Sequence, residues 1–193
     1  PERLLFAKLC GPPTFEWADG TAVHFPSKRG LALFVYLALR SGERISRDFL
    51  ADLLWADRDS SSARTALRGT IYEVKQALDS NVSAVLEVNR SHLCVDPKTV
   101  VSDITSDLAP SQAIMFLSGF EVGSIAFDEW ISETRVRLTK AATAKAMDSA
   151  ETALAEGNGE RALEIVTELI SIDPLDEPAH RLSMRAKVAL GRR

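Results

Sequence analysis

The chain has 193 residues, of which 46% are hydrophobic, and its formal net charge at pH 7 is −4. This length and composition suit one or two globular domains with buried cores. The sequence contains no run of about 18 apolar residues and no apolar signal-peptide core near its start, so it predicts neither a transmembrane span nor secretion by a signal peptide. We therefore expect a cytoplasmic protein that does not bind a membrane.

Charge is unevenly distributed along the chain. Basic and acidic residues are equal in number in residues 1–96, and the acidic excess lies in residues 97–193. A neutral first half can still bind phosphate if its basic residues share one face, because screening limits the reach of each charge to about 10 Å. Cys10 and Cys94 are far apart and the three histidines are scattered, so we expect no metal and no other cofactor.

The first residues favour β-strands. Apolar and aromatic residues predict strands over residues 4–9 and 14–18, and Asp19-Gly20 is a hairpin turn signal before a returning strand over residues 22–25. A short extended piece is expected again at Arg44-Ile45. These segments predict a small sheet ahead of the helices.

Two helices are expected between these strands and residue 56. The first runs from Lys28 to about Arg40, with Ser27 as its N-cap and Gly42 at its end. The second runs from 47 to 55 after the N-cap Ser46. Its inward residues are predicted to be Phe49, Leu50, Leu53, Leu54 and Trp55.

Residues 62–78 predict an amphipathic helix, capped by Ser61 or Ser62. Its apolar residues recur on one side at a helical period. They are Ala63, Ala66, Leu67, Ile71, Val74 and Leu78. The other side carries polar residues, and Arg64, Arg68 and Tyr72, spaced i, i+4 and i+8, are expected to follow one stripe.

A β-hairpin is expected over residues 85–95, with Asn89-Arg90-Ser91 at its tip. Strands, three helices and a hairpin in this order are typical of a winged helix-turn-helix. In such a fold the third helix enters the major groove of DNA, and the hairpin tip reaches a neighbouring groove or phosphate.

This interpretation assigns DNA contacts by position. Residues expected to read bases are Arg64, Thr65 and Arg68. Residues expected at phosphates or in the wing are Lys28, Arg29, Ser46, Arg47, Tyr72, Lys75 and Arg90. The alternative for each is a solvated surface residue without a task. Gly69, inside the third helix, either permits close approach to DNA or is merely tolerated.

The second half predicts helices only. A Ser/Thr/Asp-rich link over 97–109 precedes expected helices at 111–117, at 127–157 as one or two helices, at 160–172 and at 177–190. This part resembles a tetratricopeptide repeat in the spacing of Gly157, Ala162 and Pro174. The next repeat stops after one helix, so we expect the natural chain to continue.

The predicted fold is therefore α+β followed by all-α. We expect a winged-helix domain over residues 1–104 and a tetratricopeptide-like domain over residues 105–193, truncated at its C-terminus. No glycine-rich phosphate loop and no catalytic constellation is recognisable, so we expect no enzyme.

Two sets of residues resemble a known family. Ile45-Ser-Arg-Asp-Phe-Leu-Ala-Asp-Leu-Leu-Trp55 and Ala63-Arg-Thr-Ala-Leu-Arg68 resemble the OmpR-type winged helix of the Streptomyces antibiotic regulatory protein family. Phe116-Leu-Ser-Gly-Phe120, Phe127-Asp-Glu-Trp-Ile131 and Glu133-Thr-Arg-Val-Arg-Leu138 resemble its bacterial transcriptional activator domain.

The resemblance implies a bacterial transcription activator that binds promoter DNA, pairs head to tail as a homodimer on direct repeats and contacts RNA polymerase. It places the recognition helix at residues 63–78 and the wing at 85–95. Glu73, Val74 and Lys75 stand where family members often carry more arginine. The alternative is an interaction scaffold, or the front end of a signalling protein, whose winged helix no longer binds DNA.

Overall fold

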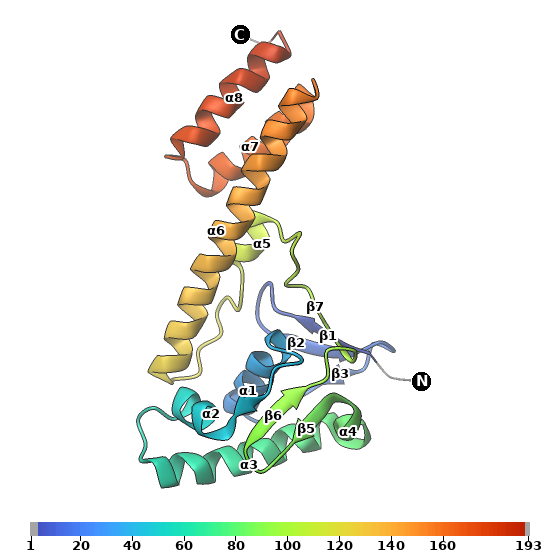
Figure 1. Cartoon of the computed structure of the whole chain (residues 1–193), viewed down its shortest axis with the longest axis vertical. Coiled ribbons are helices and arrows are strands. Elements are labelled where there is room, and N and C mark those ends of the chain that lie inside the picture. Colours follow the sequence, from blue (N-terminus) through green and yellow to red (C-terminus); the bar gives the residue numbers. More distant parts are fainter. Residues whose placement is uncertain (1–3, 192–193) are drawn as a thin grey trace. The chain divides into compact units, whose positions relative to one another are not determined.

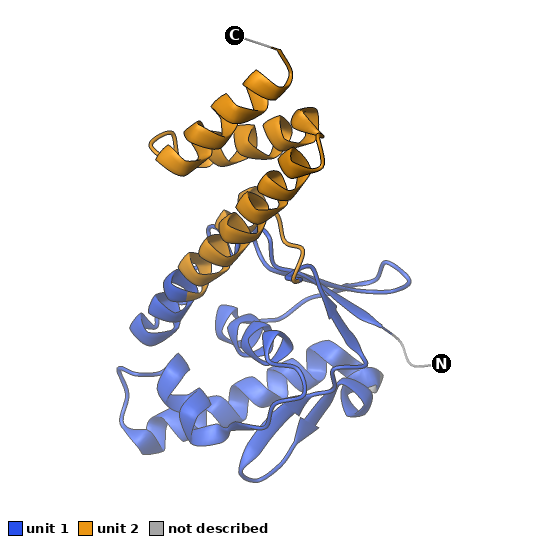
Figure 2. Ribbon diagram, turned by 45° about the horizontal axis from the view of Figure 1, so that its top comes forward, with its two compact units in different colours: residues 1–105, 116–133 blue, residues 106–115, 134–193 orange. Residues whose placement is uncertain are grey.

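The computed structural model describes residues 4–191, with the side chain of Ser80 excepted. The outer ends of the two predicted domains therefore lie outside the described residues. The chain divides into two compact units (Figure 2). Unit 1 comprises residues 1–105 and 116–133, and unit 2 comprises residues 106–115 and 134–193. The predicted boundary between residues 104 and 105 stays a prediction.

Unit 1 begins with a four-stranded sheet in the order β3-β2-β1-β7. The strands are β1 Leu5–Lys8, β2 Thr14–Trp17, β3 Ala22–Val23 and β7 Val100–Ser102. β1 pairs antiparallel with β2 and parallel with β7. The strand β7 within the link over 97–109 was not anticipated from the sequence, because its place in the sheet depends on pairing with β1 from the start of the chain.

Three helices follow as expected: α1 Lys28–Leu39, α2 Arg47–Leu54 and α3 Ser60–Leu78. Ser27 caps α1 by accepting the N–H of Gly30, and Ser46 caps α2 by accepting that of Phe49. The cap of α3 is Asp59 and not Ser61 or Ser62, because one carboxylate oxygen accepts the N–H groups of both serines at 3.0 Å. Hydrogen bonds from Ser62 hold the pKa of Asp59 below its ordinary value.

The wing lies beside α3 (Figure 1). It follows the short helices η1 Asp79–Asn81 and α4 Val82–Val85, and consists of β5 Leu86–Val88 and β6 His92–Val95 with its tip at residues 89–91, as predicted. A third short strand, β4 Ile45–Ser46, pairs with β6. The start of α2 is thereby fixed next to the wing.

The apolar face of α3 is buried as predicted, with Leu67, Val74 and Leu78 at most 1% exposed. Phe49 departs from the expectation, since it is 46% exposed. It lies in the first turn of α2, where its ring contacts Tyr36 at a centroid distance of 5.7 Å and is otherwise partly open to solvent.

Residues 116–133 complete the core of unit 1. Phe116 and Phe127 are fully buried, and the ring of Trp130 lies 4.9 Å from that of Tyr36 in α1. The Ser124 hydroxyl donates to the carbonyl of Leu53 at 2.7 Å. This segment therefore packs with residues far earlier in the chain.

The helices of unit 2 confirm the helical expectation from residue 111 onward, whereas β7 departs from the expectation of helices only in the second half. They are α5 Pro110–Ile114, the part of α6 Ile125–Ala155 that belongs to this unit, α7 Gly159–Ile172 and α8 Glu177–Ala189. The alternative of one or two helices before Gly157 is resolved in favour of one, α6. Ala150, Val166 and Leu182 form a buried cluster between helices. None of the helices in residues 4–191 is long and apolar enough to span a membrane.

Candidate nucleic-acid interface

Four arginines from three elements of unit 1 line one hollow of about 290 Å³. Arg47 comes from the start of α2, Arg64 and Arg68 from α3, and Arg90 from the wing tip. Asp48 and Leu67 complete the lining. The structure thus brings together four of the residues singled out from the sequence, and we call them, with Asp48, the arginine hollow.

Backbone contacts hold the wing tip at this place. The N–H of Arg47 donates to the carbonyl of Ser91 at 2.9 Å, and its guanidinium donates to the carbonyl of Asn89 at 3.3 Å. Ser46 pairs with His92 in the β4–β6 ladder. Arg47 is therefore half-buried and positions the wing, while Arg90 between these anchors is exposed.

The two arginines of α3 are exposed and have different partners. Nε of Arg64 donates to Oδ1 of Asp48 at 2.8 Å. A terminal nitrogen of Arg68 donates to the hydroxyl of Thr65 at 3.2 Å, within the same helix. Thr65 therefore supports Arg68, and both lie where a partner in front of α3 can reach them.

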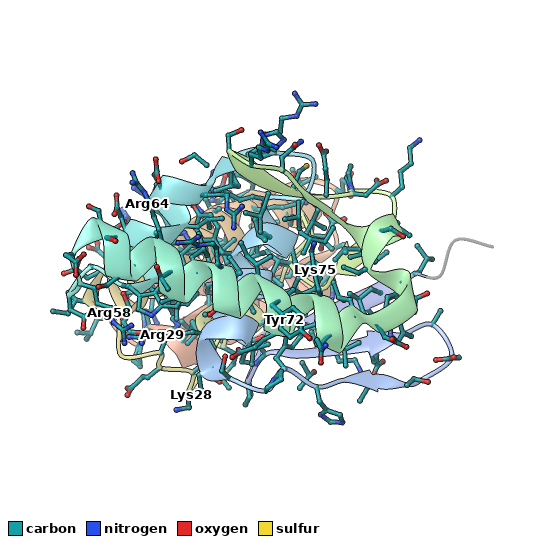
Figure 3. All side chains as sticks on the ribbon, turned by 90° about the horizontal axis from the view of Figure 1, so that it is seen from below. Lys28, Arg29, Arg58, Arg64, Tyr72 and Lys75 are labelled. Atoms are coloured by element: carbon teal, nitrogen blue, oxygen red, sulfur yellow. The ribbon has the colours of Figure 1, made fainter. Side chains whose placement is uncertain are left out.

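Tyr72 does not share the edge of α3 that carries Arg64. Figure 3 looks at the exposed side of α3 and shows Arg64 and Lys75 along one edge and Tyr72 along the other. With about 3.6 residues per turn, a step of eight residues advances roughly 80° around the helix, whereas eleven residues return close to the starting line. The expected stripe therefore drifts. Tyr72, 63% exposed, accepts a hydrogen bond from Gln76.

A second basic group lies beyond the opposite edge of α3, made by Lys28, Arg29 and Arg58 (Figure 3). The guanidinium of Arg29 stacks over the ring of Trp55 at 5.4 Å, and within residues 4–191 no partner accepts a hydrogen bond from its buried Nε. Arg29 is therefore partly committed to packing. The sequence reasoning missed Arg58, which stands in a loop between Asp57 and Asp59 where the acidic neighbours mask it.

The N-terminus of α1 is less open to phosphate than expected. The Ser27 hydroxyl, which caps this helix, donates to a carboxylate oxygen of Glu73 in α3 at 2.5 Å. A carboxylate of the chain itself thus stands where the helix dipole would attract an anion. Lys28 can still reach phosphate through its long exposed side chain, and Glu73 links α3 to α1.

The electrostatics of the arginine hollow differ from those of the chain as a whole. Its described lining holds four guanidinium groups and one carboxylate, although residues 1–96 are neutral in total. Charges separated by more than a Debye length are screened from each other, so the local excess decides what the surface attracts. The described lining of the arginine hollow therefore carries a local excess of positive charge.

The part of the chain that the structure describes has no group of three His, Cys, Asp or Glu side chains that could hold a metal ion, near the arginine hollow or elsewhere.

Burial, together with the nearby charge of Asp103 and its hydrogen bond, raises the pKa of Cys10 to about 11. Cys10 is therefore a protonated thiol at neutral pH.

Residues 108–193 match the family described as the bacterial transcriptional activator domain. This stretch, somewhat less than half of the chain, is thus similar to that domain family. This match agrees with the second part of the resemblance to the Streptomyces antibiotic regulatory protein family, and the element order of unit 1 agrees with the winged helix expected for the first part.

The same architecture occurs in a solved structure, that of Mycobacterium tuberculosis EmbR in complex with low affinity phosphopeptide. It superposes with a TM-score of 0.74 over 99% of this chain at 17% sequence identity, which establishes a shared fold. The match covers 56% of the EmbR chain, so the present chain spans little more than half its length. No curated protein matches the sequence.

Proposed function

We propose that unit 1 binds double-stranded promoter DNA in a sequence-specific manner, with α3 in the major groove and the wing tip on the flanking backbone or minor groove. The observation that carries this proposal is the arginine hollow, because three separate elements converge to put Arg47, Arg64, Arg68 and Arg90 on one surface. An acidic or interrupted surface there would instead favour an interaction scaffold.

The two basic groups suit the form of a duplex. The major groove admits one α-helix and is bordered on each side by a phosphate backbone. α3 has the arginine hollow on one side and Lys28, Arg29 and Arg58 on the other (Figure 3). In the proposed complex, Arg64 and Arg68 face base edges, and Lys75 and Arg90 contact one strand. Lys28 and Arg58 contact the other strand.

The activator domain supports a role in starting transcription and not in DNA packaging. We extend the proposal to a non-enzymatic bacterial activator that acts in the cytoplasm. Its activator domain would contact RNA polymerase, and two chains would bind head to tail on direct repeats. The domain family that residues 108–193 match supports the role as a transcription activator.

The proposal is tested with Arg68→Ala. A duplex is first selected by the intact chain from a pool of random sequences, and affinities are then measured by fluorescence anisotropy for that duplex and for its single base-pair variants. Loss of one bidentate arginine–guanine contact should weaken binding to the selected duplex by at least about 1 kcal/mol and relax the preference at one base pair.

Lys75→Ala is the matched variant on the same helix. Loss of a phosphate contact should weaken binding to all sequences alike and lower the salt slope by about one. An unchanged affinity of Arg68→Ala would reject the base-reading assignment. If the intact chain selects no sequence and binds no duplex, the scaffold alternative is favoured.

A further inference from the structure

Asp48 is the acidic residue of the arginine hollow, and the proposed function so far gives it no role. It lies in the first turn of α2, and its carboxylate accepts the Nε–H of Arg64 at 2.8 Å. The side chains of Arg64 and Asp48 are 58% and 67% exposed. An ion pair this exposed adds little to folding stability. The helix dipole favours an acid in this turn but does not require its contact with Arg64.

The geometry of the Asp48–Arg64 ion pair indicates a role for it in binding. Among the described residues, Asp48 is the one hydrogen-bond partner of the Arg64 guanidinium, and the bond uses Nε. The two terminal nitrogens, which form the outer end of the planar fork, are left to another partner. A guanine offers O6 and N7 at the spacing that such a fork matches.

When Asp48 already holds the Arg64 guanidinium in its binding orientation, Arg64 loses less conformational entropy on binding DNA. A free arginine side chain loses rotamer freedom when it binds, and a bound carboxylate removes part of that loss before DNA arrives. The same carboxylate repels phosphates, so it lowers the general attraction of the hollow to DNA. Asp48 therefore weakens binding to duplexes that lack the matching guanine and favours the duplex that has it, which is how specificity is raised against competing sites.

We propose that Asp48 is a specificity-determining positioning residue that orients Arg64 for a bidentate contact with one guanine and disfavours DNA that lacks it. This inference rests on the proposed function. It predicts opposite effects on two kinds of duplex, which a purely structural role for Asp48 would not produce.

The test uses the intact chain, the selected duplex, its single base-pair variants and a scrambled duplex. Arg64→Ala first identifies the base pair at which discrimination depends on Arg64. Asp48→Asn should then reduce discrimination at that same pair by about fivefold or more, since one good bidentate contact separates bases by at least that factor. The affinity of Asp48→Asn for the scrambled duplex should rise.

Two matched controls separate orientation from charge. Asp52→Asn removes an exposed carboxylate one turn further along α2 and should leave the discrimination unchanged. Arg64→Lys keeps the charge but lacks the fork, so it should lose discrimination at the same pair. In the Arg64→Ala background, Asp48→Asn should have no further effect at that pair. Thermal unfolding by circular dichroism checks that each variant is folded.

Unchanged discrimination in Asp48→Asn would overturn the inference, as would an equal loss of discrimination in the Arg64→Ala background. A uniform loss of affinity with a lower melting temperature would assign Asp48 to folding and would also overturn it. If Arg68→Ala relaxes specificity while Asp48→Asn does not, this inference fails and the proposed function stands. If the intact chain binds no duplex, both fail.

Discussion

Asp103 connects two distant segments of unit 1 and contributes to the raised pKa of Cys10. Its two carboxylate oxygens accept the backbone N–H groups of Leu9 at 2.8 Å and of Cys10 at 3.0 Å. The negative charge therefore stands beside the thiol. Together with burial, which is the larger cause, it raises the pKa of Cys10 to about 11.

Alkylation should report this shift. In a Cys94→Ala variant, iodoacetamide at pH 8 should modify Cys10 roughly 100-fold more slowly than a thiol of ordinary pKa, because only the thiolate reacts. The rate should rise with pH until it approaches the folded pKa. Asp103→Asn removes the negative charge, so its rate should begin to rise at lower pH. Reaction of the unmodified Cys10 at the rate of a free thiol would contradict the shift.

At the scale of elements, α3 combines a buried apolar face with an exposed face that carries Gly69 in mid-helix. Apart from its chain neighbours and the backbone of its own helix, a Cβ at Gly69 would meet nothing within 4 Å. Packing within the protein therefore does not require glycine there. The cost of glycine in a helix interior, about 1 kcal/mol relative to alanine, is unopposed by any contact in the fold.

Gly69→Ala should therefore raise the free energy of unfolding by about 0.5–1 kcal/mol, measured by urea denaturation. The DNA affinity of the same variant decides between the two interpretations of this glycine. Weaker binding to the selected duplex would mean that the backbone approaches DNA closely at this point, and unchanged binding would mean that Gly69 is only tolerated. A lower stability would show that the helix bends or packs differently near Gly69.

At the scale of the whole molecule, unit 1 is built from two separate stretches of chain (Figure 2). Residues 116–133 supply the fully buried Phe116 and Phe127, and Leu117 donates its N–H to the carbonyl of Leu9 at 2.9 Å. The family match to the activator domain, by contrast, covers residues 108–193. Part of the segment that matches this family thus packs in the core of unit 1.

A fragment of residues 1–104 should consequently be less stable than one of residues 1–133. Loss of buried phenylalanines typically costs about 3–5 kcal/mol each, so the difference in free energy of unfolding should reach at least about 3 kcal/mol in urea denaturation. Within the longer fragment, Phe127→Ala should reproduce much of this loss. Ile125→Ala, at a side chain 75% exposed, should change stability by less than about 0.5 kcal/mol. Equal stability of the two fragments would support an independent domain ending at residue 104.

The sequence by itself determined the parts whose signals are local. The positions of α1, α2 and α3, the caps Ser27 and Ser46, and the wing tip at residues 89–91 follow from helical periodicity, capping chemistry and strand alternation, all of which act within a few residues. Local patterns also marked Arg64, Arg68 and Arg90 as exposed, which is why the arginine hollow could be anticipated in outline.

Only the tertiary structure decided which distant residues meet. Strand β7 exists because β1 pairs with it, the pairing of Asp48 with Arg64 joins two helices, and residues 116–133 pack against α1. In the sequence, Glu73 departs from the arginine-rich pattern of the family, and in three dimensions it accepts the hydrogen bond of the Ser27 hydroxyl. Contacts of this kind depend on the spatial arrangement of whole elements, and no pattern within one segment specifies them.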